Sequence, residues 1–153
     1  MLTLNHILLL LVTYSGLLVG TIISHFTKEE LKAGKKYFIF ARPVVLSLVF
    51  FYFLKFLAVS PAISIPLSGI IAVLYFLWDV KSNLPYNDVL AYSLLAVILF
   101  ETAGTFAAGL IFIFGLLTAS VYYDTKENLA YNLILPVRDN IVYLFIGIVI
   151  ALI

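Results

Sequence analysis

Two charged side chains lie in segments that are otherwise poor in charge, and they are the first candidates for chemistry. Lys55 and Glu101 each follow a long apolar stretch. A charge at the centre of a membrane helix costs roughly 2.5–3.5 kcal/mol, so such residues usually belong to a binding site or an ion pathway. We expect Lys55 and Glu101 to form an ion pair near the outer ends of two spans, with the hydroxyls of Thr102 and Thr105 completing a polar binding site. Alternatively, Lys55 reaches the membrane surface and Glu101 lies at a hydrated turn.

A second layer of charge stands near the predicted inner ends of the spans. It consists of Arg42, Asp79, Asp88, Arg138 and Asp139. Arg42 and Arg138 could together hold a phosphate or an anionic lipid headgroup. The favoured alternative is that the arginine side chains extend to the headgroups and form ion pairs there. Asp79 and Asp88 flank a predicted loop, and Asp88 is expected to cap a helix N-terminus.

No other residue pattern in the sequence indicates a known chemistry. The chain has no cysteine, and it lacks the HExxH, GxSxG, Walker A and GxGxxG patterns. His6 and His25 are 19 residues apart on one predicted helix, which separates them by about 28 Å. We therefore expect no metal site and no cofactor, and the sequence gives no positive sign of an enzyme.

The composition identifies the surroundings of these residues. The chain has 153 residues, of which 64% are hydrophobic and 11% are charged, with a net charge of +1. Soluble domains are about 45–50% apolar and about 25% charged. A domain this small has too little interior to bury so much apolar surface, so a lipid bilayer is the expected partner. The balanced charge excludes a nucleic-acid-binding protein.

Apolar runs of membrane-crossing length predict one transmembrane domain over residues 1–153. The expected fold is an all-α polytopic helical bundle with six spans, at about 4–26, 37–59, 63–79, 87–103, 105–123 and 137–153. The region 89–123, in which Glu101 is the only charged residue, would measure about 52 Å as one helix, against a hydrocarbon core of about 30 Å. It must therefore bend, and residues 101–105 are the expected position. The last run, 140–153, is short for a full span.

The positive charges support six spans. With the N-terminus outside, 8 of the 9 lysines and arginines fall at inner loops or helix ends. We therefore expect a plasma-membrane protein with cytoplasmic basic loops and both termini outside. The basic segment 27–36 is either a loop or a short interfacial helix ending near Gly34. Weakly repeated spacings suggest three tandem helical hairpins, although inward-running spans that end in basic loops also align by chance.

Small residues at four-residue spacing predict where helices pack closely. Gly16 and Gly20 form such a pattern in the first span, and Gly115 and Ala119 form one in the fifth. Further small residues in 105–123 indicate that this span lies at the centre of the bundle.

Three functions remain open at the level of sequence. The leading hypothesis is a small transporter or permeation protein for a small solute or ion, because charge within a membrane usually has a function. The second is a noncatalytic assembly subunit, and a homo-oligomer or a membrane-protein partner is compatible with either. The third is an enzyme that acts on lipid headgroups, which requires Arg42, Arg138, Asp79 and Asp88 to converge.

Overall fold

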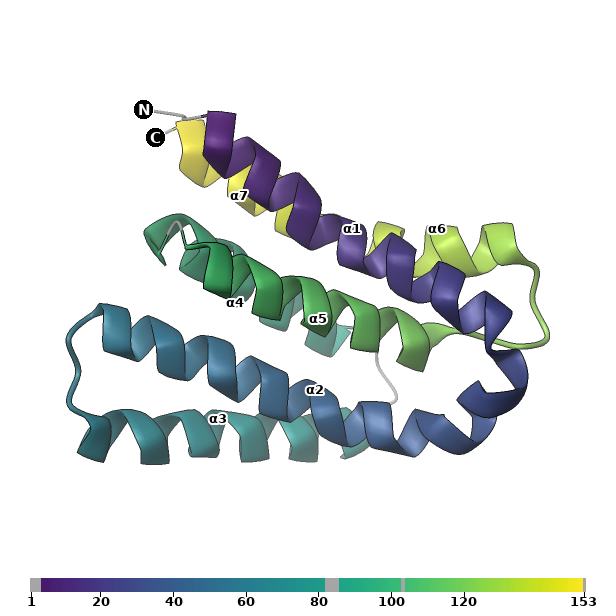
Figure 1. Ribbon diagram of the computed structural model, residues 1–153, viewed down its shortest axis with the longest axis horizontal. Coiled ribbons are helices and arrows are strands. Elements are labelled where there is room, and N and C mark those ends of the chain that lie inside the picture. Colours follow the sequence, from purple (N-terminus) through teal and green to yellow (C-terminus); the bar gives the residue numbers. More distant parts are fainter. Residues whose placement is uncertain (1–3, 82–85, 103, 153) are drawn as a thin grey trace.

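The computed structural model describes residues 4–81, 86–102 and 104–152, and these form a bundle of α-helices (Figure 1). The helices are α1 (Leu4–Phe26), α2 (Lys28–Phe56), α3 (Pro61–Lys81), α4 (Tyr86–Thr102), α5 (Thr105–Tyr122), α6 (Leu129–Asp139) and α7 (Val142–Leu152). Successive passes alternate in direction, so that α1, α3 and α5 run one way and α2, α4 and the α6–α7 pair run the other. The start of α1 and the end of α7 consequently lie at the same end of the bundle.

Four helices are long and apolar enough to cross a membrane, namely α1, α2, α3 and α5. The α6–α7 pair is a fifth candidate if its 41° bend is counted within one span. The helix α4 has 17 residues, which gives a length of about 25 Å. The all-α membrane-type bundle is therefore confirmed, whereas the count of six spans stays a prediction.

The bends of the chain fall partly where the sequence predicts them. The break between α4 and α5 lies within the predicted 101–105 bend. The turn between α2 and α3 ends before Pro61, where α3 begins, and α3 continues through Pro66. A proline in the first turn is well tolerated, since that N–H has no partner within the helix. The tight part of this turn is Ala58, which has a φ of 59°.

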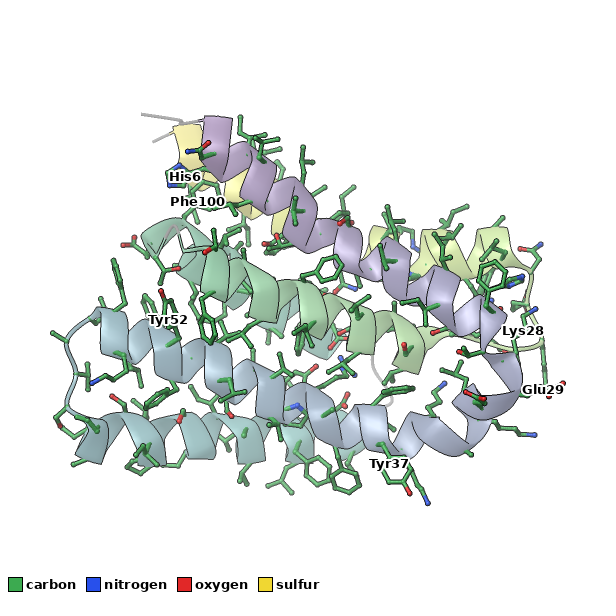
Figure 2. The ribbon with its side chains drawn as sticks, viewed as in Figure 1. His6, Lys28, Glu29, Tyr37, Tyr52 and Phe100 are labelled. Atoms are coloured by element: carbon green, nitrogen blue, oxygen red, sulfur yellow. The ribbon has the colours of Figure 1, made fainter. Side chains whose placement is uncertain are left out.

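The segment 27–36 is neither a loop nor a separate short helix. The helix α2 begins at Lys28 and passes through Gly34 and Pro43 without ending, so the expected stop at Gly34 is wrong. Its 29 residues extend about 43 Å, well beyond a hydrocarbon core of about 30 Å. Figure 2 places Lys28 and Glu29 at the end of the bundle opposite His6 and Phe100. We call the end that carries Lys28 the lysine-rich end.

Close helix packing is concentrated between α1 and α5, the two helices that carry the predicted small-residue patterns. A Cβ added to Gly16 would stand 2.4 Å from the carbonyl oxygen of Phe112, and one added to Gly20 would stand 2.6 Å from that of Leu116. Gly115 faces the backbone of Leu17 in the same way, at 3.1 Å. Only glycine allows this approach of two backbones. The helix α5 also packs against α2, α4 and α6, which confirms its central place.

The packing does not follow the predicted tandem hairpins. The most extensive contacts join α1 to α5, α2 to both α3 and α5, and α4 to α7. The two helices of the α1–α5 pair are parallel and far apart in sequence. Fully buried side chains from several helices, including Leu17, Val49, Leu95, Ile111 and Phe114, form one core.

Candidate functional site

A buried arginine, Arg42 of α2, forms the centre of the polar interior. Its side chain is only 1% exposed, although it lies midway along a helix of membrane-crossing length. Its Nη1 donates hydrogen bonds to both carboxylate oxygens of Asp79, at 3.3 and 3.4 Å. Its Nη2 donates to Asp88 and, at 2.6 Å, to the hydroxyl of Tyr75. One guanidinium therefore joins α2 to α3 and α4.

The two carboxylates differ in their surroundings. The Asp88 side chain is 4% exposed, and its Oδ1 also accepts a hydrogen bond of 2.6 Å from the Tyr75 hydroxyl. The hydroxyl of Tyr122, from α5, also faces this carboxylate. The Asp79 side chain is 16% exposed. Asp88 is therefore enclosed on all sides, whereas Asp79 lies closer to the edge of the bundle.

Aromatic rings complete the enclosure. The guanidinium carbon of Arg42 lies 5.5 Å from the ring centroid of Tyr75 and 5.7 Å from that of Phe114. The negative face of an aromatic ring attracts a cation, and this attraction strengthens away from water. Four consecutive helices of the chain, α2 to α5, thus contribute to one site, which we call the Arg42 cluster: Arg42, Tyr75, Asp79, Asp88 and Tyr122.

Local sequence explains how these residues meet. Tyr75 and Asp79 are four residues apart on α3, so both lie on the same helix face. Asp79 is near the end of α3 and Asp88 is in the first turn of α4, which brings both to the same level of the bundle. Arg42 reaches that level from the middle of α2. Asp88 lies in the first turn of α4, near the helix N-terminus as predicted, and its carboxylate also pairs with Arg42 and Tyr75.

Further hydroxyl groups continue the polar interior beyond the Arg42 cluster. Tyr92 lies one turn beyond Asp88 on α4 and faces Thr118 of α5, outside ordinary hydrogen-bonding geometry. The Tyr92 ring packs edge-on against Tyr143 at 5.6 Å, and the Tyr143 hydroxyl is 2.5 Å from Thr13 Oγ1. Within the described residues, Arg42 Nε and the hydroxyls of Tyr92 and Thr118 are buried without a partner.

The residues predicted as the polar binding site lie elsewhere. Lys55 and Glu101 are both exposed, near the opposite end of the bundle from Lys28. Ion pairs in the described parts of the chain join Arg42 to Asp79 and Asp88, and Arg138 to Asp139, so no ion pair joins Lys55 to Glu101. Thr102 is buried and donates to the carbonyl of Ile98, whereas Thr105 is exposed.

The anion site predicted from Arg42 and Arg138 is not formed, because the two arginines belong to separate ion pairs. Arg138 is 68% exposed and pairs with Asp139, its neighbour in the chain. Arg42 is buried, so the expectation that its side chain extends to the headgroups is wrong, while the expected ion pairing is present. The sequence placed Arg42, Asp79 and Asp88 in one layer but brought them together only in the enzyme hypothesis, with Arg138 as a fourth member. The signal was the charge balance within that layer, because an arginine in an apolar run requires a carboxylate.

The described residues contain no group of three or more His, Cys, Asp or Glu side chains that could hold a metal ion. His6 stacks on Phe100 at 5.5 Å, and His25 Nδ1 lies 2.9 Å from the Tyr123 hydroxyl. The two histidines thus occupy separate structural contacts between neighbouring helices.

The charge of the Arg42 cluster determines what it can do. Among its described side chains, one cation faces two carboxylates, which leaves one net negative charge in a largely buried place. An uncompensated charge in a low-dielectric interior is costly, and binding a proton or a small cation removes that cost. The cluster can therefore act as a binding site for a single positive charge.

Comparisons with known proteins add no identity to this geometry: no family model, no curated protein and no solved structure matches the chain. The class that the fold itself defines is an all-α helical bundle with four to five helices long and apolar enough to cross a membrane.

Proposed function

We propose that this protein is a small membrane transporter or permeation protein for a proton or a small monovalent cation, with the Arg42 cluster as its binding site. The net negative charge shared by Arg42, Asp79 and Asp88 carries the proposal. Ionisable side chains inside a membrane bundle commonly mark ion pathways and proton relays. This site replaces Glu101 and Lys55 as the centre of the proposal, because those two side chains are exposed and not paired with each other.

Two observations support a small transported species. The cluster is tightly enclosed on one side, since Phe114, whose ring lies beside the Arg42 guanidinium, has no exposed surface. The buried hydroxyls of Tyr92 and Thr118 provide polar atoms that continue from Asp88 into the bundle. Hydroxyl groups both donate and accept hydrogen bonds, which is what a proton relay requires.

The orientation that we propose puts the lysine-rich end in the cytoplasm. Five lysines gather at this end. Four are in the first turns of α2, namely Lys28, Lys32, Lys35 and Lys36, and Lys126 is in the connection between α5 and α6. Cytoplasmic segments of membrane proteins are enriched in lysine and arginine. In this orientation the protein lies in the plasma membrane and both of its termini face the outside of the cell.

Flux measurements in liposomes test the proposal. The purified chain is reconstituted into vesicles that contain a pH-sensitive dye, and a potassium gradient with valinomycin sets the membrane potential. We expect proton flux above that of empty vesicles for the wild type, and background flux for Asp88→Asn, which removes the most enclosed carboxylate. Asp79→Asn is the second variant, because it keeps the Arg42–Asp88 pair. Glu101→Gln is the matched control and should keep wild-type flux.

Vesicles prepared without valinomycin and with sodium or potassium indicators cover the alkali cations. Wild-type flux no greater than that of empty vesicles, for protons and for both cations, would overturn the proposal. Equal flux in the wild type and in both folded Asp variants would show that the Arg42 cluster is not the site. Loss of flux in Glu101→Gln alone would return the site to the position predicted from the sequence.

The assembly-subunit hypothesis has one supporting observation of its own. Only 17% of the apolar window of α3 is buried, and an added Cβ at Gly69 would meet nothing within 4 Å. A second copy or another membrane protein could pack on this face. The mass of the protein in detergent tests this second proposal, and a monomer would count against a homo-oligomer. The lipid-headgroup enzyme receives less support, because Arg42 already binds both carboxylates that the reaction would need.

A further inference from the structure

A pocket opens at the lysine-rich end, next to the Arg42 cluster, with which it shares Tyr122. Its volume is about 370 Å³, which is within the usual range for small-ligand sites. One wall is formed by residues 31–35 near the start of α2. The other is formed by the end of α5 and the chain that follows it, residues 122–126. The lining residues are Leu31, Lys32, Lys35, Tyr122, Tyr123, Asp124, Thr125 and Lys126.

The charge of this pocket is positive. Lys32, Lys35 and Lys126 contribute three positive charges, and Asp124 contributes one negative charge, so the lining carries a net charge of +2. One carboxylate oxygen of Asp124 accepts a hydrogen bond of 2.9 Å from the backbone N–H of Lys126. This hydrogen bond stabilises the turn at Asp124. The three lysines outnumber the single carboxylate, so the net charge of the lining is positive.

The loop side of the pocket is held in place by a buried asparagine. Asn132 of α6 is 2% exposed, and its side chain accepts from the N–H of Asp124 and donates to the carbonyl of Asp124, each at 2.8 Å. Its Nδ2 also donates to the carbonyl of Asn128 at 3.1 Å. The connection after α5 is thus fixed against α6, which keeps Lys126 opposite α2 without an ordering cost on binding.

The length of α2 places the pocket at the level of lipid headgroups. A helix of about 43 Å exceeds the hydrocarbon core by about 13 Å, which corresponds to roughly nine residues. The polar part of α2 is its start, Lys28–Lys36, so this part is the portion that extends beyond the core. Aromatic side chains are exposed at both sides of it, with Phe26 82% and Tyr37 65% exposed. Such rings are typical of the interface between membrane and water.

We propose that this pocket binds a phosphate group, either on an anionic phospholipid headgroup or from solution. Lysine ammonium groups bind phosphate oxygens as point charges, and the converging chains of Lys32, Lys35 and Lys126 offer several donors around one space. Leu31 is 4% exposed and closes the apolar side of the pocket. The proposal does not depend on transport by the Arg42 cluster.

Lipid retention by the purified full-length chain tests the phosphate site. The protein is prepared in neutral detergent, and native mass spectrometry measures binding of phosphatidic acid and, for comparison, of phosphatidylcholine. We expect the double variant Lys32→Gln/Lys35→Gln to lose about 10-fold or more in affinity for phosphatidic acid, because two charge-assisted contacts are removed. The double variant Lys28→Gln/Lys36→Gln is the matched control. It removes the same charge from the same segment of α2, at residues that do not line the pocket.

A competition with inorganic phosphate distinguishes the two sources. Displacement of phosphatidic acid by millimolar phosphate indicates a site that also takes phosphate from solution, and retention of the lipid indicates a headgroup site. Both results support phosphate recognition, provided that the control variant binds like the wild type. Equal losses in the two double variants would reduce the effect to general charge attraction and would overturn the proposal. Unchanged binding in Lys32→Gln/Lys35→Gln would overturn it as well.

Discussion

The contact between α1 and α5 predicts that replacing glycine by alanine lowers the free energy of unfolding at Gly16 but not at Gly109. Replacing Gly16 by alanine adds a single carbon, which would stand 2.4 Å from the carbonyl oxygen of Phe112. Ordinary contact begins at 3.4 Å, so the two backbones must separate by about 1.0 Å, the difference of these distances. The obstacle is backbone rather than a flexible side chain end. Overpacking of this kind costs about 1–3 kcal/mol.

Gly109 on α5 provides the matched control. An added Cβ there meets nothing within 4 Å, so Gly109→Ala introduces no clash. Alanine is favoured over glycine inside a helix by about 0.8–1.0 kcal/mol, and this gain applies to both variants. We expect Gly109→Ala to be as stable as the wild type or up to about 1 kcal/mol more stable. Gly16→Ala should then be about 1–3 kcal/mol less stable than Gly109→Ala, because the difference between the two variants isolates the clash.

Unfolding in mixed micelles of a mild detergent and sodium dodecyl sulfate measures both free energies. Circular dichroism follows the loss of helix, and the same preparation of wild-type protein gives the reference. Equal stability of Gly16→Ala and Gly109→Ala would refute the close approach of α1 and α5. A lower stability of Gly109→Ala would instead show that its helix face is covered.

Three further predictions concern charge and orientation. Arg42→Gln should lower the free energy of unfolding by about 3–5 kcal/mol, because it leaves buried carboxylates unpaired. Adding Asp88→Asn to this variant should recover part of the lost free energy in the same assay. Lys55→Gln and Glu101→Gln should each change the free energy of unfolding by less than about 0.5 kcal/mol, because both side chains are exposed and are not paired with each other. The two effects should add in the double variant, and a coupling above about 0.5 kcal/mol would contradict the separation of the two side chains. A cysteine introduced at Lys32 should react with a membrane-impermeant reagent only from the cytoplasmic side, and labelling from outside would reverse the proposed orientation.

The sequence was sufficient for the class of fold and for the closest helix contact. Composition and run length determine a membrane-type helical bundle because they depend only on the total apolar surface. The spacing of Gly16 and Gly20 predicts a close contact because glycine at this interval has one dominant use in apolar helices. That these glycines meet the segment of α5 around Gly115 was not predicted and comes from the structure.

The functional cluster was harder to predict, since it depends on which helices are neighbours. Lys55 and Glu101 look similar to Arg42 and Asp88 in sequence, as each is a charge beside an apolar run. The difference is depth and burial. Arg42 lies midway along α2, because this helix starts at Lys28 rather than at residue 37, and three helices surround its side chain. The sequence shows the apolar run but not which helices enclose it, so it could not indicate that Arg42 is buried among its partners.

The order of Arg42 and its partners along the chain has a consequence for biosynthesis. Asp79 and Asp88 follow Arg42 by 37 and 46 residues, so the ribosome completes α2 before either carboxylate exists. A lone arginine within the apolar part of a nascent helix is costly on entry into the lipid phase, by up to about 2.5–3.5 kcal/mol at the centre of a span. Release of α2 from the translocon should therefore wait for α3 and the first turn of α4, which makes these segments a cooperative unit of membrane insertion.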